Sequence, residues 1–277
     1  MVSELVSFIK KNNFLIFLIF FTPFLALAET SIEDYRKYDV TKTKFTLEKS
    51  AKDLSYPWAL SFIDKTNIVI TEKDGGIYKV DVLSGKKQKI KHNIPHIGYD
   101  GGGQGGLLDV YFNPSDGYTY FTYSHKSSKL TRSKQLSKKS STAIARGRLI
   151  ENEIKDFEIL LIAKPEFLEN RHYGSRIAIK GVDLFVSFGE RGQGMISQDP
   201  SKHPGSIIRI KTDGAIPQDN PHFIEKKDWL PEIYVIGVRN PQGIAISPHD
   251  DELYFSNHGP RGGDHIGQVE FGSNYGW

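Results

Sequence analysis

Residues 57–75 read PWALSFIDKTNIVITEKDG, an apolar strand, a turn and a second strand that ends in a hydroxyl residue before a polar loop. The same order recurs in GGLLDVYFNPSDGYTYFTYSHK (105–126), GSRIAIKGVDLFVSFGERG (174–192) and NPQGIAISPHDDELYFSNHGP (240–260). An apolar–hydroxyl pair holds the same place in each repeat: Ile70-Thr71, Phe121-Thr122, Val186-Ser187 and Phe255-Ser256. Repeated hairpins without helices between them predict the blades of a β-propeller.

The later repeats are spaced more widely than a blade of roughly 40–50 residues, so they must carry insertions. The Ser/Lys-rich stretch 126–141 and the Pro/Asp-rich stretch 212–231 are the candidates. Alternating runs at 76–82 and 206–210 predict outer strands of the blades. No convincing amphipathic helix follows residue 28, so the sequence predicts an all-β fold.

The composition narrows the classes of partner. The chain of 277 residues has a formal charge of only +3, which gives no support for nucleic acid or anionic lipid as a partner. Twenty-six glycines and thirteen prolines favour many short strands joined by tight turns. There is no cysteine, so stability must come from a buried core rather than from disulfides.

The first 28 residues have the order of a secretory signal peptide. Lys10 and Lys11 precede an apolar run at 14–21, and Ala26-Leu27-Ala28 supplies a cleavage site. The alternative is an uncleaved anchor, but the apolar run is shorter than the ~20 residues that a spanning helix needs. We therefore expect cleavage after Ala28, a mature domain at 29–277, a periplasmic or secreted location and no stable membrane insertion afterwards.

In a propeller, equivalent loops of successive blades meet at one mouth of the channel, which makes that mouth the candidate site. The loops after the second strands are Glu72-Lys73-Asp74, Ser124-His125, Gly189-Glu190-Arg191-Gly192 and His258-Gly259-Pro260. His172, in a loop before a strand, could take a proton from an alcohol whose hydride is leaving. Glu190 could orient the imidazole and stabilise its charged form. A lone loop histidine is more often structural or merely exposed.

Three further positions have the chemistry of ligand contacts. Arg239 with Asn240 suits carboxylate and quinone oxygens, although an isolated arginine more often pairs with a surface acid. Gln104, in a Gly-rich loop with no helix after it, could bind a sugar hydroxyl but does not form a nucleotide loop. The carbonyls of Gly259 and Pro260 are hard oxygen donors suited to Ca²⁺, in a spacing unlike an EF-hand.

Together these segments resemble the glucose/sorbosone dehydrogenase family, the soluble pyrroloquinoline-quinone (PQQ) sugar dehydrogenases. The matching stretches, in family order, are Tyr56-Pro57-Trp58-Ala59-Leu60, Thr71-Glu72-Lys73-Asp74-Gly75, Gly103-Gln104-Gly105-Gly106-Leu107-Leu108-Asp109, His172-Tyr173-Gly174-Ser175-Arg176, 213–221, Arg239-Asn240-Pro241-Gln242-Gly243 and Gly272-Ser273-Asn274-Tyr275-Gly276-Trp277. The resemblance implies a six-bladed propeller of which this chain holds about four to four and a half blades. It also implies that the family's remaining cofactor-clamping residues lie outside residues 1–277, so we expect the chain alone to be inactive.

The resemblance also implies roles for individual residues. It makes His172 the general base at the sugar C1 hydroxyl, with Glu190 supporting it where Asp is usual. It places Arg239 and Asn240 against the quinone, with Arg239 steadying charge that develops there. Gln104 would face the sugar.

By the same resemblance, the carbonyls of Gly259 and Pro260 would hold the Ca²⁺ that polarises PQQ. Two departures change the expectations. Arg171 stands where some members carry an acid, so their sugar preference does not transfer. His265 follows Asp264 where Glu is usual, which argues against a second Ca²⁺ site.

The sequence therefore predicts an oxidoreductase that converts an aldose to its lactone, with PQQ accepting the hydride and a soluble acceptor taking the electrons. One alternative is a catalytically silent propeller that binds carbohydrate or protein. Another is a Ca²⁺-dependent propeller lactonase, which would need more channel-facing carboxylates than the sequence offers.

Overall fold

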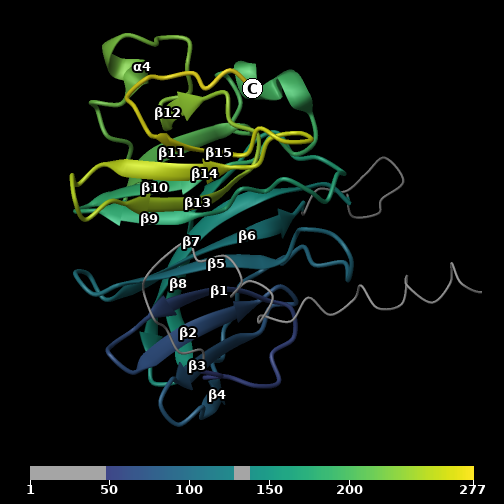
Figure 1. Cartoon of the computed structure of the whole chain (residues 1–277), viewed down its shortest axis with the longest axis vertical. Helices are drawn as coiled ribbons and strands as arrows, with labels where there is room; N and C mark the ends of the chain where they lie inside the picture. The colour runs from purple at the N-terminus through teal and green to yellow at the C-terminus, as the bar shows by residue number, and fades with distance from the viewer. Residues whose placement is uncertain (1–47, 128–137) are drawn as a thin grey trace, which may run out of the picture. The chain divides into compact units, whose positions relative to one another are not determined.

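The computed structural model describes residues 48–127 and 138–277, and residues 49–277 form one compact unit. Four antiparallel sheets make up this unit and follow one another in chain order, as the colours of Figure 1 show. The predicted leader and its cleavage site lie outside the described residues.

Each sheet is built from consecutive strands, and we call the sheets blades 1 to 4. Blade 1 holds β1 (Pro57–Phe62), β2 (Asn67–Glu72), β3 (Ile77–Asp81) and β4 (Lys87–Lys89). Blade 2 holds β5 (Leu107–Asn113), β6 (Tyr118–Lys126), β7 (Ser140–Ile150) and β8 (Glu153–Ile162). Blade 3 holds β9 (Ile177–Lys180), β10 (Asp183–Ser187), β11 (Ser206–Lys211) and β12 (Ile233–Ile236). Blade 4 holds β13 (Pro241–Ile246), β14 (Leu253–Asn257) and β15 (His265–Gln268).

The propeller prediction is confirmed, because each predicted hairpin forms the first two strands of a blade. The predicted outer strands at 76–82 and 206–210 are β3 and β11. In the described part of the chain, the helical elements are a short 3₁₀ turn, η1 (Gly194–Gln198), and α4 (Pro221–Ile224), which lies in the predicted insertion 212–231. Among residues 48–127 and 138–277, no helix is long and apolar enough to cross a membrane.

The hydrophobic core lies between neighbouring blades rather than at one centre. Successive side chains of a strand point to opposite faces of its sheet. On β6, Phe121 therefore packs with Val69 of blade 1, whereas Tyr120 packs with Leu184 of blade 3. A third cluster joins blades 3 and 4 through residues such as Phe255. Each blade is thus stabilised by its neighbours, which holds the loops at their ends in register.

The hydroxyl that recurs in the sequence repeat joins each blade to the next. In the first three blades this side chain donates a hydrogen bond to a backbone carbonyl at the start of the following blade. The pairs are Thr71 to Leu108 (2.6 Å), Thr122 to Ser175 (2.6 Å) and Ser187 to Pro241 (3.2 Å). The repeat therefore encodes the spacing between blades as well as the strands within them.

Candidate functional site

All four blades contribute to one cavity of about 250 Å³. Its lining residues are Trp58 and Lys73 from blade 1, Gln104 and Leu108 from blade 2, Tyr173 and Gly174 from blade 3, and Asn240, Gln242 and His258 from blade 4. A volume slightly below the ~300 Å³ at the lower end of ligand pockets suits part of a small molecule. An adjoining hollow of about 480 Å³ along β14 and β15 shares Gln242 and His258, so a larger ligand could extend into it.

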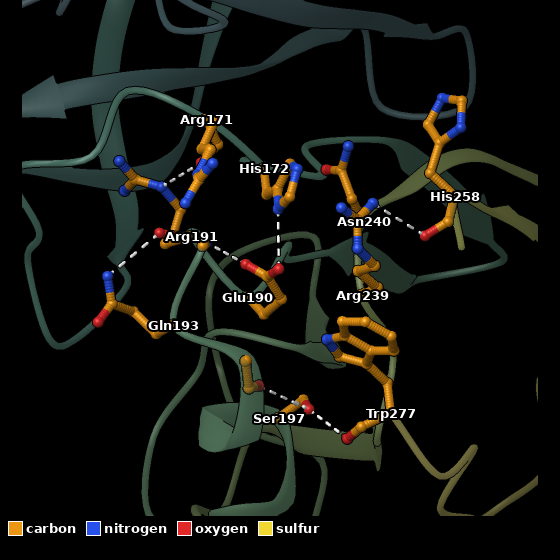
Figure 2. Close-up of polar contacts among 12 residues, drawn as sticks. Arg171, His172, Glu190, Arg191, Gln193, Ser197, Arg239, Asn240, His258 and Trp277 are labelled. Atoms are coloured by element: carbon orange, nitrogen blue, oxygen red, sulfur yellow. Dashed lines mark hydrogen bonds and ion pairs between the residues drawn. The ribbon is translucent and has the colours of Figure 1, made fainter. Parts of the chain in front are cut away.

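His172 and Glu190 form a hydrogen-bonded pair beside this cavity (Figure 2). His172 Nδ1 lies 2.8 Å from Glu190 Oε1, and the two side chains are only 12% and 3% exposed. Gly192 N–H donates to the second oxygen of Glu190. An ionised carboxylate can only accept, so the tautomer of a neutral imidazole that fits this contact carries its proton on Nδ1. His172 Nε2 therefore keeps its lone pair and can accept a proton.

The backbone of His172 is held in an uncommon conformation by three neighbours. Its φ is 51°, in the left-handed region that non-glycine residues rarely adopt. Its N–H donates to Gln104 Oε1 (2.6 Å), and its carbonyl accepts from Arg191 N–H (3.3 Å). Gly189 is required opposite this carbonyl, because a Cβ there would overlap it. Gln104 therefore lines the cavity with its oxygen already engaged, which leaves its amide nitrogen for a ligand.

The side-chain oxygen of Asn240 is engaged by the protein itself and is not free to bind a ligand. Its Oδ1 accepts hydrogen bonds from Gly174 N–H (3.1 Å) and from Gln242 Nε2 (3.2 Å). These bonds lock the loop that follows His172 to the start of β13. Asn240 thus fixes the relative position of blades 3 and 4 at the cavity wall.

Arg239 carries a buried donor that has no partner among the described residues. Its guanidinium lies 5.4 Å from the ring centre of Trp277, and Nη1 donates to His258 O (3.3 Å). The buried Nε of Arg239 and the buried indole Nε1 of Trp277 make no hydrogen bond within the described structure. Buried polar groups are almost always satisfied, so these two donors are the ones here that an acceptor oxygen would satisfy.

The carboxylate of the loop after β14 is already engaged by neighbours in the same loop. Gly259 N–H donates to Asp264 Oδ1 (2.8 Å), and Asp264 Oδ2 lies 3.5 Å from His258 Nδ1. Within residues 48–127 and 138–277, no group of three or more His, Asp or Glu side chains could hold a metal ion. A cation at Gly259 and Pro260 would therefore have to take backbone carbonyls.

The structure adds residues to which the sequence gave no individual role. Lys73 Nζ donates to Gly103 O and so holds the Gly-rich loop just before Gln104. Gly102, in the same loop, has no neighbouring atom within 4 Å of where a Cβ would stand. Trp58 and Gln242 could have been found, because both stand in the repeated segments.

Ser124 and His125 do not form a mouth loop, contrary to the expectation for the second repeat. β6 continues to Lys126, and Ser124 Oγ donates to Gly98 O (2.9 Å) in the segment between β4 and β5. The ring of His125 packs on His96, with 5.4 Å between the ring centres. Blade 2 instead reaches the cavity through the loop before β5.

Four propeller blades thus bring a histidine–carboxylate pair, and an arginine whose Nε has no partner in the described structure, to one cavity. Residues 54–277 match the family model described as Glucose / Sorbosone dehydrogenase. The chain belongs to this family.

The most informative relatives are sugar dehydrogenases. Aldose sugar dehydrogenase YliI of Escherichia coli is 34% identical over 231 residues, which cover 81% of this chain and 59% of that protein. Quinoprotein glucose dehydrogenase B of Acinetobacter calcoaceticus is 28% identical over 250 residues, covering 81% and 50%. The PQQ-bound aldose sugar dehydrogenase from Streptomyces coelicolor superimposes with a TM-score of 0.69 at 25% identity, covering 83% of this chain and 65% of that one. The chain thus spans between half and two thirds of these relatives.

Proposed function

We propose that this chain forms the His172-bearing part of a quinoprotein that oxidises the C1 hydroxyl of an aldose to a lactone. The observation that carries the proposal is the buried His172–Glu190 pair, 2.8 Å apart, beside a cavity to which every blade contributes. The family and its sugar-dehydrogenase relatives support the same reaction.

His172 and Glu190 would carry the proton transfer. His172 Nε2 takes the proton of the C1 hydroxyl, and the carboxylate of Glu190 stabilises the imidazolium that forms at Nδ1–H. The amide nitrogen of Gln104 can donate to a sugar oxygen, since its own oxygen is held by His172 N–H. The substrate hydroxyl is thus positioned by the same side chain that positions the base.

The donor groups around Arg239 fit PQQ, whose carboxylates and quinone oxygens are acceptors. Arg239 Nε and Trp277 Nε1 are the unpartnered buried donors that such oxygens would satisfy. PQQ supplies the acceptor for the hydride when it is bound. Asn240 holds the wall of its site, and Arg239 steadies negative charge that develops on the ligand.

We further propose an exported protein that passes electrons to a soluble acceptor and binds one Ca²⁺. The signal-peptide pattern of residues 1–28 supports export. The carbonyls of Gly259 and Pro260, next to His258 at the cavity, support the Ca²⁺ position.

Two measurements test the function. PQQ is titrated into the chain by calorimetry, with Arg239→Gln as the variant and Lys65→Gln, at an exposed turn of blade 1, as the control. We expect about tenfold weaker binding for Arg239→Gln alone, since it loses charged hydrogen bonds worth about 1.5–3 kcal/mol each. Aldose-dependent dye reduction is then measured on a chimaera that joins this chain to the part of the E. coli relative that it does not cover.

The outcomes separate the candidate functions. Saturable PQQ binding with aldose oxidation supports the dehydrogenase. Sugar binding without PQQ binding or oxidation would support the silent binding propeller instead. Lactone hydrolysis that requires Ca²⁺ but not PQQ would support the lactonase.

A further inference from the structure

Arg191 is the most deeply buried arginine described, and the proposed reaction does not use it. Its side chain is 2% exposed, and none of the ion pairs of the described residues involves it. Burial lowers the pKa of its guanidinium, an effect only partly offset by the Tyr173 phenol and the charges of Glu169 and Glu190. An unpaired buried cation is expensive, so its retention requires a specific set of contacts.

Those contacts are backbone carbonyls of the loop that carries His172. Arg191 Nε donates to Arg171 O (2.9 Å), and Nη2 donates to Glu169 O. Nη1 donates to Ser140 O (2.9 Å), which ties the loop to β7 of blade 2. The guanidinium lies 3.7 Å from the ring centre of Tyr173. Figure 2 shows Arg191 beside Arg171, with Glu190 directed to the imidazole of His172.

Glu190 and Arg191 are consecutive residues that hold His172 in two different ways. Glu190 binds the ring through Nδ1 (2.8 Å). The backbone N–H of Arg191 binds the carbonyl of His172 (3.3 Å), and its guanidinium binds the carbonyls on the N-terminal side. A residue at φ 51° persists only where its surroundings over-determine it.

We propose that Arg191 is a positioning residue whose guanidinium holds the left-handed turn at His172 and thereby aims the imidazole at Glu190. The catalytic consequence rests on the proposed function, but the geometry can be tested without turnover. Arg191 touches neither the sugar nor PQQ in this mechanism. It acts through the backbone of the loop.

The test compares Arg191→Met and Arg191→Lys with a matched control. Arg148 also stacks on a tyrosine, with its guanidinium 4.0 Å from the ring centre of Tyr118. It also donates to a backbone carbonyl, that of Asp116 (3.1 Å), but on the far side of blade 2. Arg148→Met removes a smaller set of the same two kinds of contact, one stacked tyrosine and one carbonyl, away from His172. It therefore reports any general loss of stability.

The first readout is the Nδ1–H proton of His172, observed by NMR on the histidine-labelled chain and assigned with His172→Gln. We expect a slowly exchanging, hydrogen-bonded proton in the wild-type chain and in Arg148→Met. Its exchange should be about tenfold faster or more in Arg191→Met, with a smaller change in Arg191→Lys. If Arg191→Met does not fold, Arg191→Lys decides the question. An unchanged His172 proton in the folded variant would overturn the proposal.

The second readout is kinetic and uses the chimaera. We expect Arg191→Lys to lower kcat by about 10–100-fold, because a small misplacement of a base is enough to do so. PQQ affinity and the KM for the sugar should stay within about twofold, because neither contact involves Arg191. Equal losses in Arg148→Met would show a merely structural role. If Arg191→Met changes the exchange of the His172 proton but the wild-type chimaera oxidises no sugar, the positioning role stands and the proposed dehydrogenase function fails.

Discussion

Arg176 and Asp109 form an ion pair between blades 3 and 2, with 3.1 Å between Arg176 Nη1 and Asp109 Oδ1. Burial raises the pKa of Asp109 even though the charge of Arg176 opposes this. Arg176 Nε also donates to Gln242 O of blade 4 (2.8 Å), and the guanidinium lies 4.2 Å from the ring centre of Trp58 in blade 1. One side chain therefore contacts the three other blades near the cavity.

Arg176→Lys should destabilise the chain although it keeps the positive charge. An ammonium cannot reproduce the planar fork that serves Asp109 and Gln242 while stacking on Trp58. We expect the free energy of unfolding to fall by about 1–3 kcal/mol in urea denaturation. Arg261→Lys, at an exposed position, should change it by less than about 0.5 kcal/mol. If Arg176→Lys were as stable as Arg261→Lys, the contacts of Arg176 with the other blades would not contribute to stability.

Thr122→Val should be destabilising, whereas Thr119→Val on the same strand should not. The Thr122 hydroxyl donates to Ser175 O (2.6 Å) and accepts from Asp109 N–H (3.0 Å), so its loss leaves two buried groups unpaired. We expect a loss of about 1–3 kcal/mol by thermal or urea unfolding. The buried hydroxyl of Thr119 has no partner in the described structure, so its removal should be neutral or stabilising. A similar loss in both variants would contradict the blade-bridging role.

His172→Gln should slow sugar oxidation by the chimaera without loss of PQQ. Removal of a general base lowers kcat by about 10²–10⁴-fold. PQQ affinity, measured by calorimetry, should be unchanged, because His172 is bonded to Glu190 and Gln104. His249→Gln, at an exposed turn, serves as the control. An unchanged kcat would remove His172 from the mechanism.

Local patterns were sufficient to predict the blades, because strand alternation and turns are encoded within each repeat. The apolar residues that match between repeats also hold matching places in the sheets. Ile70 pairs with Leu60 in blade 1, and Phe121 pairs with Val110 in blade 2. The length of β6 could not be read in this way. Lys126 pairs with Ser140 across the insertion, so the strand runs further than its own residues indicate.

In the candidate site, too, local sequence patterns predicted some features, whereas contacts between distant segments decide others. His172 and Glu190 were predicted together because both lie at the same end of one repeat. The orientation of Gln104 depends on a contact with a loop 68 residues later, which no local pattern reports. The burial of Arg191 likewise depends on carbonyls from two separate segments. Sequence could therefore name His172 and Glu190 but not the contacts that hold them.

Glu232→Gln should reduce stability at neutral pH but not in acid. Burial raises the pKa of Glu232, but its hydrogen bonds and the charges of the histidines beside it, His203 first (Nε2–Oε1 2.6 Å), together lower the net pKa. A carboxyl with a lowered pKa stabilises the fold above its unfolded pKa of about 4.3, and this contribution is lost as the pH falls through its folded pKa.

The Glu232→Gln variant should therefore be less stable than wild type by about 1–3 kcal/mol at neutral pH, with the difference shrinking towards about pH 3. Urea denaturation at the two pH values measures it. Glu153→Gln, whose side chain is 50% exposed, is the control and should show no such pH dependence. A constant difference between the Glu232 variant and wild type would contradict this assignment.

Ca²⁺ should strengthen PQQ binding, and chelation should reverse the effect. The carbonyl oxygens of Gly259 and Pro260 are the hard donors that Ca²⁺ prefers. We expect about tenfold tighter PQQ binding by calorimetry with Ca²⁺ than with excess EDTA, equivalent to about 1.4 kcal/mol. Mg²⁺ should do less, because it demands a regular octahedral site and keeps its waters. Equal affinities with Ca²⁺ and EDTA would remove the metal from the proposal.

The open space at Gly102 makes this position of the loop before β5 suitable for substitution in directed evolution. A Cβ added there would meet no atom within 4 Å, and the backbone of Gly102 does not adopt the left-handed conformation that excludes other residues. Gln104, two positions later, keeps its bond to His172 N–H while Gly102 varies. A saturation library at this single codon would therefore vary the Gly-rich loop beside Gln104 while leaving His172, Glu190 and the hydrogen bonds between blades unchanged.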